Sequence, residues 1–355
     1  MSLQLSLKYR PQVFADVIGQ DVAVRILRNS VSLRRVSKAY LFSGIQGVGK
    51  TTLARIFAKA LSCSNFKDDP CCQCSSCQDA QQGAHPSILE LDAASHNGVD
   101  DIRGLDDLLR QKALHPYRVL ILDEAHMLTR QAQAAFLKTL EDAAANNVFL
   151  LVTTDPDSLE PTVRSRCLSM PLRPLSPAAI ACSVRQVLAA EGRDYDESFV
   201  DSLSLLGGGS LRDVQQVLDR AMVVPGKLTG EALVDICGVL SVAQYKDLAS
   251  VLIYKDLRYA LDMLETWYAQ GIDLVLVFRD GIPTLARDFL VCLSGASDVY
   301  YHSGLTHEAL VRNLSLSVAD VRRIIREWEV SCGMMETTNN PKAIFTAFFA
   351  KVFWA

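Results

Sequence analysis

The sequence lacks the long apolar runs that would place a chain in a membrane. None of its hydrophobic stretches approaches the roughly 20 residues that a transmembrane helix needs. Residues 1–12 include Lys8 and Arg10 and contain no apolar core typical of a signal peptide. An excess of positive charge is missing too, because the formal net charge at pH 7 is −4. We therefore expect a soluble cytoplasmic protein, in which any contact with nucleic acid uses a local basic surface.

Internal repeats and low-complexity tails are also absent, and 49% of the 355 residues are hydrophobic, which is enough for buried cores. Short apolar runs alternate with helical patterns along the first half of the chain. This alternation predicts an α/β fold with a parallel sheet covered on both faces. The predicted strands lie at 40–43, 88–91, 118–122, 148–153 and 167–170, and the clearest helices at 51–61 and 130–142.

Strand signals almost disappear after a segment with three prolines, 171–177, which we interpret as a domain boundary. The pattern of residues 178–240 predicts short helices broken by Gly207-Gly208-Gly209. The pattern of residues 241–355 predicts helices throughout, with a kink or break at Pro283. The sequence therefore predicts three domains, which cover residues 1–177, 178–240 and 241–355.

A glycine-rich loop follows the first predicted strand and opens the next helix. It matches the pattern G-x-x-x-x-G-K-T of a phosphate-binding loop. In such a loop the backbone N–H groups turn inward around a polyphosphate, the lysine reaches the β- and γ-phosphates, and the threonine holds Mg²⁺. The sequence thus predicts a nucleoside triphosphate site with Mg²⁺. The loop spans residues 44–52, and its predicted site residues are Gly44, Gly47, Val48, Gly49, Lys50, Thr51 and Thr52.

Two carboxylates, Asp123 and Glu124, end the apolar run 118–122. Ligands bind at the carboxyl ends of strands in open α/β sheets. We expect Asp123 to position Mg²⁺ and Glu124 to orient and deprotonate an attacking water. The alternative is a pair of surface acids without a catalytic role.

The ten cysteines are unevenly distributed, and five of them fall between positions 63 and 77. Two overlapping C-x-x-C pairs and one earlier cysteine can surround Zn²⁺ tetrahedrally, and four sulfur ligands make a structural site. A reducing compartment disfavours disulfides, which leaves metal-free thiols as the alternative. We predict a zinc module at about residues 62–80, with Cys72 as an extra thiol beside the ligands Cys63, Cys71, Cys74 and Cys77.

Seven segments in this order together resemble the AAA+ clamp-loader ATPase family, and among its members the gamma/tau subunits of bacterial DNA polymerase III. The Ser-Arg-Cys motif and the cysteine cluster make the resemblance specific. The segments are Lys8-Tyr9-Arg10-Pro11 with residues 14–20, the phosphate loop, residues 123–128, residues 137–141, Thr153-Thr154-Asp155-Pro156, Ser165-Arg166-Cys167 and Ser210-Leu211-Arg212-Asp213.

The resemblance implies roles for residues outside the phosphate loop. Thr154 and Arg212 would be the first and second sensors of bound ATP. Arg166 would be an arginine finger that acts on ATP held by a neighbouring subunit. The family also supplies the zinc ligands named above, a helical lid, and a helical collar that holds a pentameric ring together. The adenine pocket would be formed by Tyr9, Arg10, Val17 and Ile18.

Clamp loaders grip duplex DNA through phosphate contacts, which carry no sequence information. The positions that correspond to such contacts here are His96, Asn97, Arg103 and Lys138. Ordinary solvated helix faces are the alternative for Arg103 and Lys138. The family's longer form carries a C-terminal extension that binds polymerase and helicase, and we expect that region to be absent from this chain.

The sequence thus favours an ATP-driven motor subunit for DNA replication, associated with the nucleoid and without polymerase chemistry of its own. Its expected partners are the other clamp-loader subunits, the sliding clamp and primed-template DNA. Three alternatives explain the sequence less well. The cysteine cluster and Ser165-Arg166-Cys167 argue against another AAA+ ATPase of DNA repair or branch migration, and a small-molecule P-loop kinase leaves residues 178–355 unexplained. A non-hydrolysing scaffold subunit similar to the clamp-loader stator would not need the intact residues Lys50, Thr51, Asp123 and Glu124.

Overall fold

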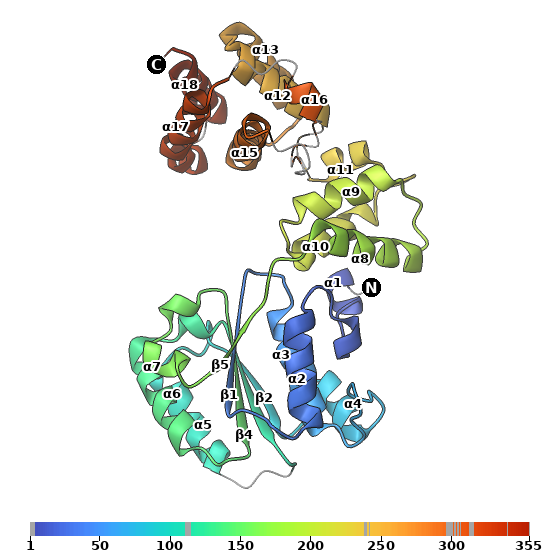
Figure 1. The fold of residues 1–355 in the computed structure, drawn as a ribbon, viewed down its shortest axis with the longest axis vertical. Helices are drawn as coiled ribbons and strands as arrows, with labels where there is room; N and C mark the ends of the chain where they lie inside the picture. The colour runs from blue at the N-terminus through green and yellow to red at the C-terminus, as the bar shows by residue number, and fades with distance from the viewer. Residues whose placement is uncertain are drawn as a thin grey trace. The chain divides into compact units, whose positions relative to one another are not determined.

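The computed structural model describes residues 4–110, 115–237, 240, 242–295, 301, 303, 305, 307–311, 316–338 and 340–354 (Figure 1). The chain separates into two compact units. The first comprises Met1–Val187 with Leu206–Asp219, and the second comprises Leu188–Leu205 with Arg220–Ala355. Among the described helices, none combines the length and the apolar character needed to cross a bilayer.

The first unit is built on a five-stranded sheet in the order β2-β3-β4-β1-β5, and all of its strand pairs are parallel. The parallel sheet predicted from the sequence is therefore confirmed. In the register, Asp92 lies opposite Asp123 and Ser43 opposite Thr153, so the strands end together at one edge. The strands are β1 (Ala39–Ser43), β2 (Ile88–Asp92), β3 (Arg118–Asp123), β4 (Asn147–Thr153) and β5 (Leu168–Pro171).

Both faces of this sheet are covered, because alternate side chains of each buried strand pack into different cores. Tyr40 and Leu150 join the core under α2 (Asp21–Ser32) and α3 (Lys50–Ser62). Leu41 and Phe149 join the opposite core, under α5 (Val99–Arg110) and α6 (Arg130–Asp142). The two helix layers flank the sheet in Figure 1.

Short elements connect the sheet to the site that is described below. They are α1 (Leu5–Lys8), the 3₁₀ turn Phe14–Asp16, α4 (Ser75–Gln81), the 3₁₀ turns Ala125–Met127 and Pro156–Ser158, and α7 (Pro161–Arg164). After the predicted proline-rich boundary the chain forms α8 (Pro177–Ala190), α9 (Glu197–Leu206) and α10 (Leu211–Ala221). The glycines at 207–209 separate α9 from α10, as the sequence predicted.

The second unit is helical, with a core that is rich in aromatic residues such as Phe278 and Phe345. A π-helical turn, Val277–Gly281, immediately precedes α15, so the predicted irregularity at Pro283 is present as a widened turn. We keep the three-domain division as a proposal. The helices are α11 (Gly230–Cys237), α12 (Val242–Tyr254), α13 (Leu257–Ala269), α14 (Leu274–Leu276), α15 (Ile282–Leu293), α16 (His307–Val311), α17 (Val318–Thr337) and α18 (Pro341–Trp354).

Candidate nucleotide site and cysteine cluster

The glycine-rich loop joins the end of β1 to the start of α3, as the sequence predicted. Gly47 and Gly49 have positive φ angles of 78° and 98°, a backbone region that residues with a side chain rarely adopt. Gly49 is the N-cap of α3, so the free backbone N–H groups of the first helical turn face the loop. This geometry can hold an anion through backbone donors and the positive end of the helix.

Lys50 is the first residue of α3 and is buried. Its Nζ donates to the carbonyl oxygen of Gly44 at 2.8 Å and to that of Ile45 at 2.9 Å, so the ammonium group lies along the loop. Burial lowers the pKa of Lys50, and the nearby carboxylates of Glu124 and Asp123 oppose this effect. A cation held in this way can bind phosphate.

The acidic pair lies beside the loop at the end of β3. Thr51 Oγ1 donates to Asp123 Oδ2 at 2.9 Å, which brings together the two side chains that were predicted to hold Mg²⁺. The backbone N–H of Glu124 donates to Asp123 Oδ1 at 3.0 Å. Glu124 has a φ of 48°, in the left-handed region, and backbone strain in non-glycine residues is concentrated at functional sites.

A histidine that the sequence analysis did not single out lies next to this pair. His126 Nδ1 is 3.6 Å from Glu124 Oε2 and 3.2 Å from the hydroxyl oxygen of Thr153 at the end of β4. Glu124 Oε2 is buried and has no hydrogen bond among the described residues. His126 therefore lies between the predicted base and the next strand, where it can fix the direction of the Glu124 carboxylate.

The start of α10 packs directly on the glycine-rich loop. The N–H of Leu211 donates to the carbonyl oxygen of Gly47 at 3.1 Å. A Cβ atom at Gly47 would lie only 1.9 Å from Ser210 Oγ, so the close approach requires glycine at this position. The contact brings Arg212, the predicted second sensor, to the loop.

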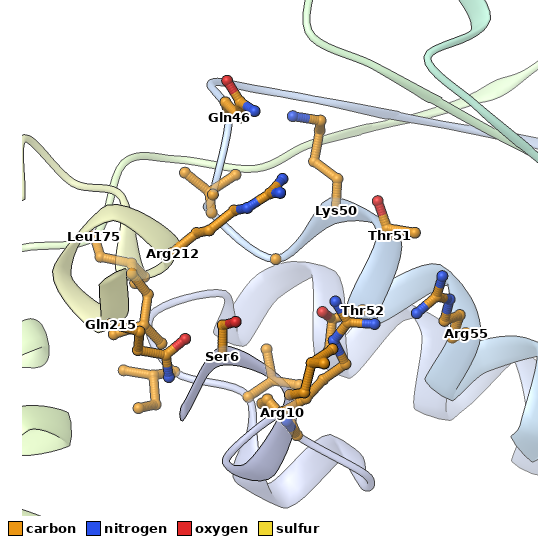
Figure 2. A pocket seen from close by; sticks show the side chains of 18 of the residues that line it. Ser6, Arg10, Gln46, Lys50, Thr51, Thr52, Arg55, Leu175, Arg212 and Gln215 are labelled. Atoms are coloured by element: carbon orange, nitrogen blue, oxygen red, sulfur yellow. The ribbon is translucent and has the colours of Figure 1, made fainter. Parts of the chain in front are cut away.

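These elements enclose a cavity of about 300 Å³ (Figure 2). Most of the predicted nucleotide-binding residues line it: Arg10, Val17, Ile18, Gly47, Val48, Gly49, Lys50, Thr51, Thr52, Asp123, Glu124 and Arg212. Several other residues that sequence reasoning missed line it as well, namely Gln4, Ser6, Leu7, Pro11, Gln46, Arg55, Leu175, Leu211 and Gln215.

Four predicted site residues do not line this cavity. Gly44 contributes its carbonyl oxygen to Lys50 from the base of the loop, and Tyr9 ends α1. Thr154 directly follows β4. Arg166 lies just beyond α7, where its guanidinium pairs with Glu141 of α6 at 2.6 Å and its side chain is 42% exposed. Their predicted roles stay predictions.

Arg55 had no sequence signal, although it lines the cavity. Its guanidinium makes a bidentate ion pair with Glu90 of β2, with Nε 2.9 Å from Oε2. Burial lowers the pKa of Arg10, another cation that lines the cavity, and the positive charge of the nearby Arg55 lowers it further. Only the parallel pairing of the sheet brings Glu90 next to α3.

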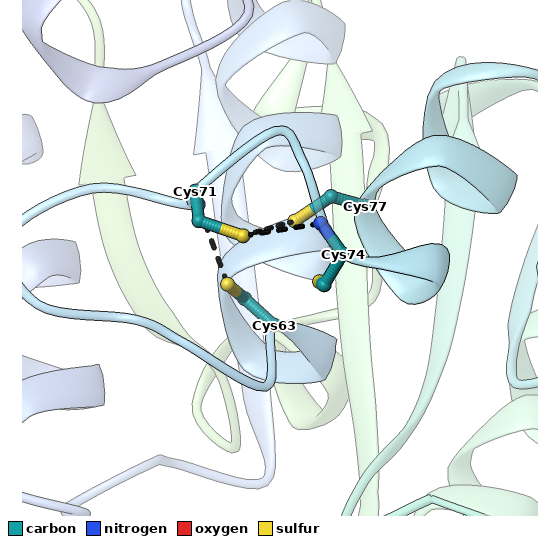
Figure 3. A group of neighbouring side chains, drawn as sticks. All are labelled: Cys63, Cys71, Cys74 and Cys77. Carbon is teal, nitrogen blue, oxygen red and sulfur yellow. Dashed lines mark hydrogen bonds between the residues drawn. The ribbon is translucent and has the colours of Figure 1, made fainter.

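The four predicted zinc ligands lie together at the end of α3 and the start of α4 (Figure 3). Their sulfur atoms are all within 4.8 Å of one another, and Cys71 Sγ is 4.0 Å from Cys77 Sγ. Four sulfurs around a tetrahedral zinc, each at about 2.3 Å, lie about 3.8 Å apart, so the cluster fits the ion. Burial raises the pKa of Cys77, whereas N–H groups of Gln73 and Cys74 lower that of Cys71 to about 6.

Cys72 does not join this cluster. Its backbone has a φ of 54°, and its Sγ lies 3.7 Å from Lys59 Nζ and 3.5 Å from the carbonyl oxygen of Pro70. The left-handed conformation at Cys72 directs its thiol away from the neighbouring ligand.

The four residues predicted to contact DNA occupy two helices and the loop before one of them. His96 Nδ1 lies 3.4 Å from Asp101 Oδ1, and Arg103 pairs with Asp100 at 3.6 Å. The carbonyl oxygen of Asn97 accepts hydrogen bonds from Thr129. Lys138 is exposed on α6. Both basic side chains near α5 thus lie beside acids.

Comparison with known proteins identifies the relatives of this chain. The sequence model of the family described as "DNA polymerase III, delta subunit" matches residues 19–176. DNA polymerase III subunit tau of Salmonella typhimurium is 36% identical over 301 residues, which are 84% of this chain and 47% of the relative. The tau subunit of Bacillus subtilis is 36% identical over 97% of this chain and 62% of the relative. The chain therefore spans about half to three fifths of these two proteins.

A gamma subunit from Buchnera aphidicola, the symbiont of Acyrthosiphon pisum, is 34% identical over 76% of this chain and 75% of the relative. Among solved structures, a variant of Thermotoga maritima RuvB shows the same fold, with a TM-score of 0.51 and 16% identity over 87% of this chain and 99% of that one. The fold is that of an AAA+ ATPase with a four-cysteine cluster, and by sequence the chain belongs to the family of DNA polymerase III gamma and tau subunits.

Proposed function

We propose that this chain is the ATP-binding and ATP-hydrolysing motor subunit of a replicative clamp loader, which opens a sliding clamp and places it on primed DNA. The main support is the contact of Thr51 with Asp123 at 2.9 Å, because both residues line the same cavity as Lys50 and Arg212. The chain also belongs to the gamma/tau family. This arrangement supplies the cation, the metal-binding oxygens and the sensor that phosphoryl transfer to water needs.

Thr51 and Asp123 would hold Mg²⁺, whose charge neutralises phosphate oxygens when it is bound. Lys50 binds the β- and γ-phosphates from the loop. Glu124 orients the attacking water and takes its proton, because its carboxylate lies at the strand end beside the loop. Arg212 reaches the phosphates from α10.

Arg166 would complete a neighbouring subunit's site. Its absence from the lining of this chain's own cavity and the exposure of its side chain just beyond α7 support a role in trans. A guanidinium supplied in this way stabilises charge on the transferring phosphoryl group, and it makes hydrolysis depend on assembly.

The four-cysteine cluster would hold a structural Zn²⁺, because four sulfur ligands leave no open position for chemistry. The helices after residue 177 would form the lid and the collar of a pentameric ring. His96, Asn97, Arg103 and Lys138 would face DNA phosphates, and the sliding clamp and other clamp-loader subunits would be the protein partners. The site of action would be the nucleoid in the cytoplasm.

The proposal is tested by measuring steady-state ATP hydrolysis per subunit against protein concentration, with the chain alone and mixed with partner subunits, clamp and primed DNA. Arg166→Ala is compared with wild type. Arg164→Ala is the matched control, because Arg164 is the last residue of α7, two positions before Arg166, and pairs with Asp157. We expect turnover that rises with concentration and falls at least about 10³-fold in Arg166→Ala, with ATP binding retained.

Two outcomes would contradict the proposal in different ways. Turnover that is independent of concentration and unchanged in Arg166→Ala would identify a self-contained ATPase. ATP binding without turnover, even in the complete mixture, would identify a non-hydrolysing scaffold subunit.

A further inference from the structure

Gln215 follows Arg212 by three residues on α10, so the two side chains lie on the same face of the helix and both line the cavity. In Figure 2 the Arg212 guanidinium extends toward Lys50, whereas Gln215 lies farther along the helix, toward Ser6. Gln215 therefore belongs to the end of the cavity that lies away from the phosphate loop.

The side chain of Gln215 has no hydrogen-bond partner in the part of the chain that the structure describes, although the residue as a whole is buried. The residue is only 6% exposed, and no hydrogen bond of its side chain is found among the described residues. Of the polar side chains that line the cavity, only those of Lys50 and Gln215 are less than a tenth exposed. Lys50 has two carbonyl partners, whereas the amide of Gln215 is not engaged by any described residue and is free to pair with a ligand in the cavity.

The surroundings of Gln215 suit a flat aromatic ring. Apolar side chains of Val17, Ile18, Leu175 and Leu211 line the same cavity. A nucleotide whose triphosphate is held by the loop and Lys50 would extend its base away from the loop, toward the part of the cavity where Gln215 lies. The unpartnered amide therefore lies where the edge of a base needs a polar contact.

We propose that Gln215 selects adenine: its carbonyl oxygen accepts from the 6-amino group, and its amide NH₂ donates to N7. This bidentate pairing matches adenine and not guanine, whose O6 and N7 both accept. The inference rests on the proposed function, because it assigns the base specificity of the same ATP site.

The test compares equilibrium binding of ATP, GTP, 7-deaza-ATP and purine riboside triphosphate, each used to displace a fluorescent ATP analogue. 7-Deaza-ATP lacks the N7 acceptor, and purine riboside triphosphate lacks the 6-amino group. We expect wild type to bind each altered nucleotide about tenfold more weakly than ATP. In Gln215→Leu the four nucleotides should bind alike.

Gln215→Glu is the second variant, because it keeps one acceptor and removes the donor. It should lose or reverse the preference for ATP over 7-deaza-ATP, because a carboxylate oxygen repels N7, and it should stay sensitive to loss of the 6-amino group. The wild-type measurements test the proposal even if Gln215→Leu fails to fold. Gln216→Leu is the matched control, since Gln216 is exposed and outside the cavity lining. It should retain the wild-type pattern.

The inference is overturned if wild type binds ATP and 7-deaza-ATP equally well, or if Gln215→Leu retains the wild-type preference. If wild type binds none of these nucleotides, the proposed function itself fails. ATP binding that is indifferent to the base changes would reject only the role of Gln215.

Discussion

At the scale of single residues, the site depends on polar contacts between the ends of neighbouring strands and the loop. Asp123 accepts from Thr51, and His126 lies between Glu124 and Thr153. The contact between Glu124 and His126 is local, whereas Thr51–Asp123 and His126–Thr153 join residues that are far apart in sequence. They exist because the parallel register ends β3 and β4 at the same edge.

We predict that His126 positions the Glu124 carboxylate for the proposed hydrolysis. Replacing it by Ala should lower the rate of hydrolysis about tenfold and leave nucleotide affinity within about twofold, because the Glu124 carboxylate would lose its direction while the phosphate contacts stay intact. The measurement is kcat in single-turnover and steady-state assays, together with the dissociation constant for ATP.

The conservative variant His126→Asn distinguishes positioning from packing. An asparagine amide can occupy the place of Nδ1 and donate to Glu124 or Thr153, so it should recover part of the rate that the alanine variant loses. Equal rates for the two variants, or a loss of ATP affinity in both, would argue against the positioning role.

At the scale of elements, the cysteine module is attached to the segment that leads into Val17 and Ile18, which line the cavity. Asp69, in the loop between Cys63 and Cys71, accepts from the N–H of Phe14 at 2.6 Å and from Arg28 at 3.1 Å. Lys59 of α3 donates to Gln12 Oε1 at 3.0 Å. The 3₁₀ turn at Phe14–Asp16 immediately precedes Val17, which lines the cavity.

Asp69→Ala should therefore weaken ATP binding severalfold and lower the free energy of unfolding by about 1–3 kcal/mol, since a charge-assisted hydrogen bond and an ion pair are lost. Bound zinc should stay at the wild-type level, because Asp69 is not among the four ligands. Removal of the metal by a chelator should weaken ATP binding in the same direction. The measurements are ATP titration, denaturant unfolding and metal analysis.

Asp68→Ala is the matched control, because Asp68 is the exposed neighbour of Asp69. It should change neither quantity. Unchanged ATP affinity in both Asp69→Ala and the metal-free protein would mean that the module is a separate structural unit without influence on the site.

At the scale of the whole molecule, the two compact units have separate cores. The cores on the two faces of the sheet belong to the first unit, and the aromatic core around Phe278 belongs to the second. All residues that line the nucleotide cavity fall within the first unit. A ligand stabilises the cooperative unit that contains its contacts.

ATP with Mg²⁺ should therefore stabilise the first unit selectively. At 100 times the dissociation constant the gain is about 2.7 kcal/mol, which corresponds to a rise in melting temperature of roughly 5–10 °C for a unit of this size. Calorimetry combined with hydrogen exchange should show slower exchange in α3 and unchanged exchange in α18. Equal protection of both helices would show that the two units unfold as one.

Local pattern determined much of this protein from the sequence by itself. Apolar periodicity predicted the strands and the parallel sheet, which the structure confirms. The glycines predicted the loop before α3, because they allow backbone conformations that other residues rarely adopt. The spacing of Cys63, Cys71, Cys74 and Cys77 predicted a cluster that the structure brings together. Membership in the gamma/tau family also follows from the sequence, because its motifs occur in family order.

Tertiary structure alone decided which other side chains meet at the site. Arg55 pairs with Glu90 across α3 and β2, Arg166 pairs with Glu141 across two helices, and Gln215 enters the cavity only because Leu211 bonds to Gly47. These residues belong to no repeating pattern and stand far from their partners along the chain. Their positions are set by strand order and helix packing, which the periodicity of a single segment does not encode.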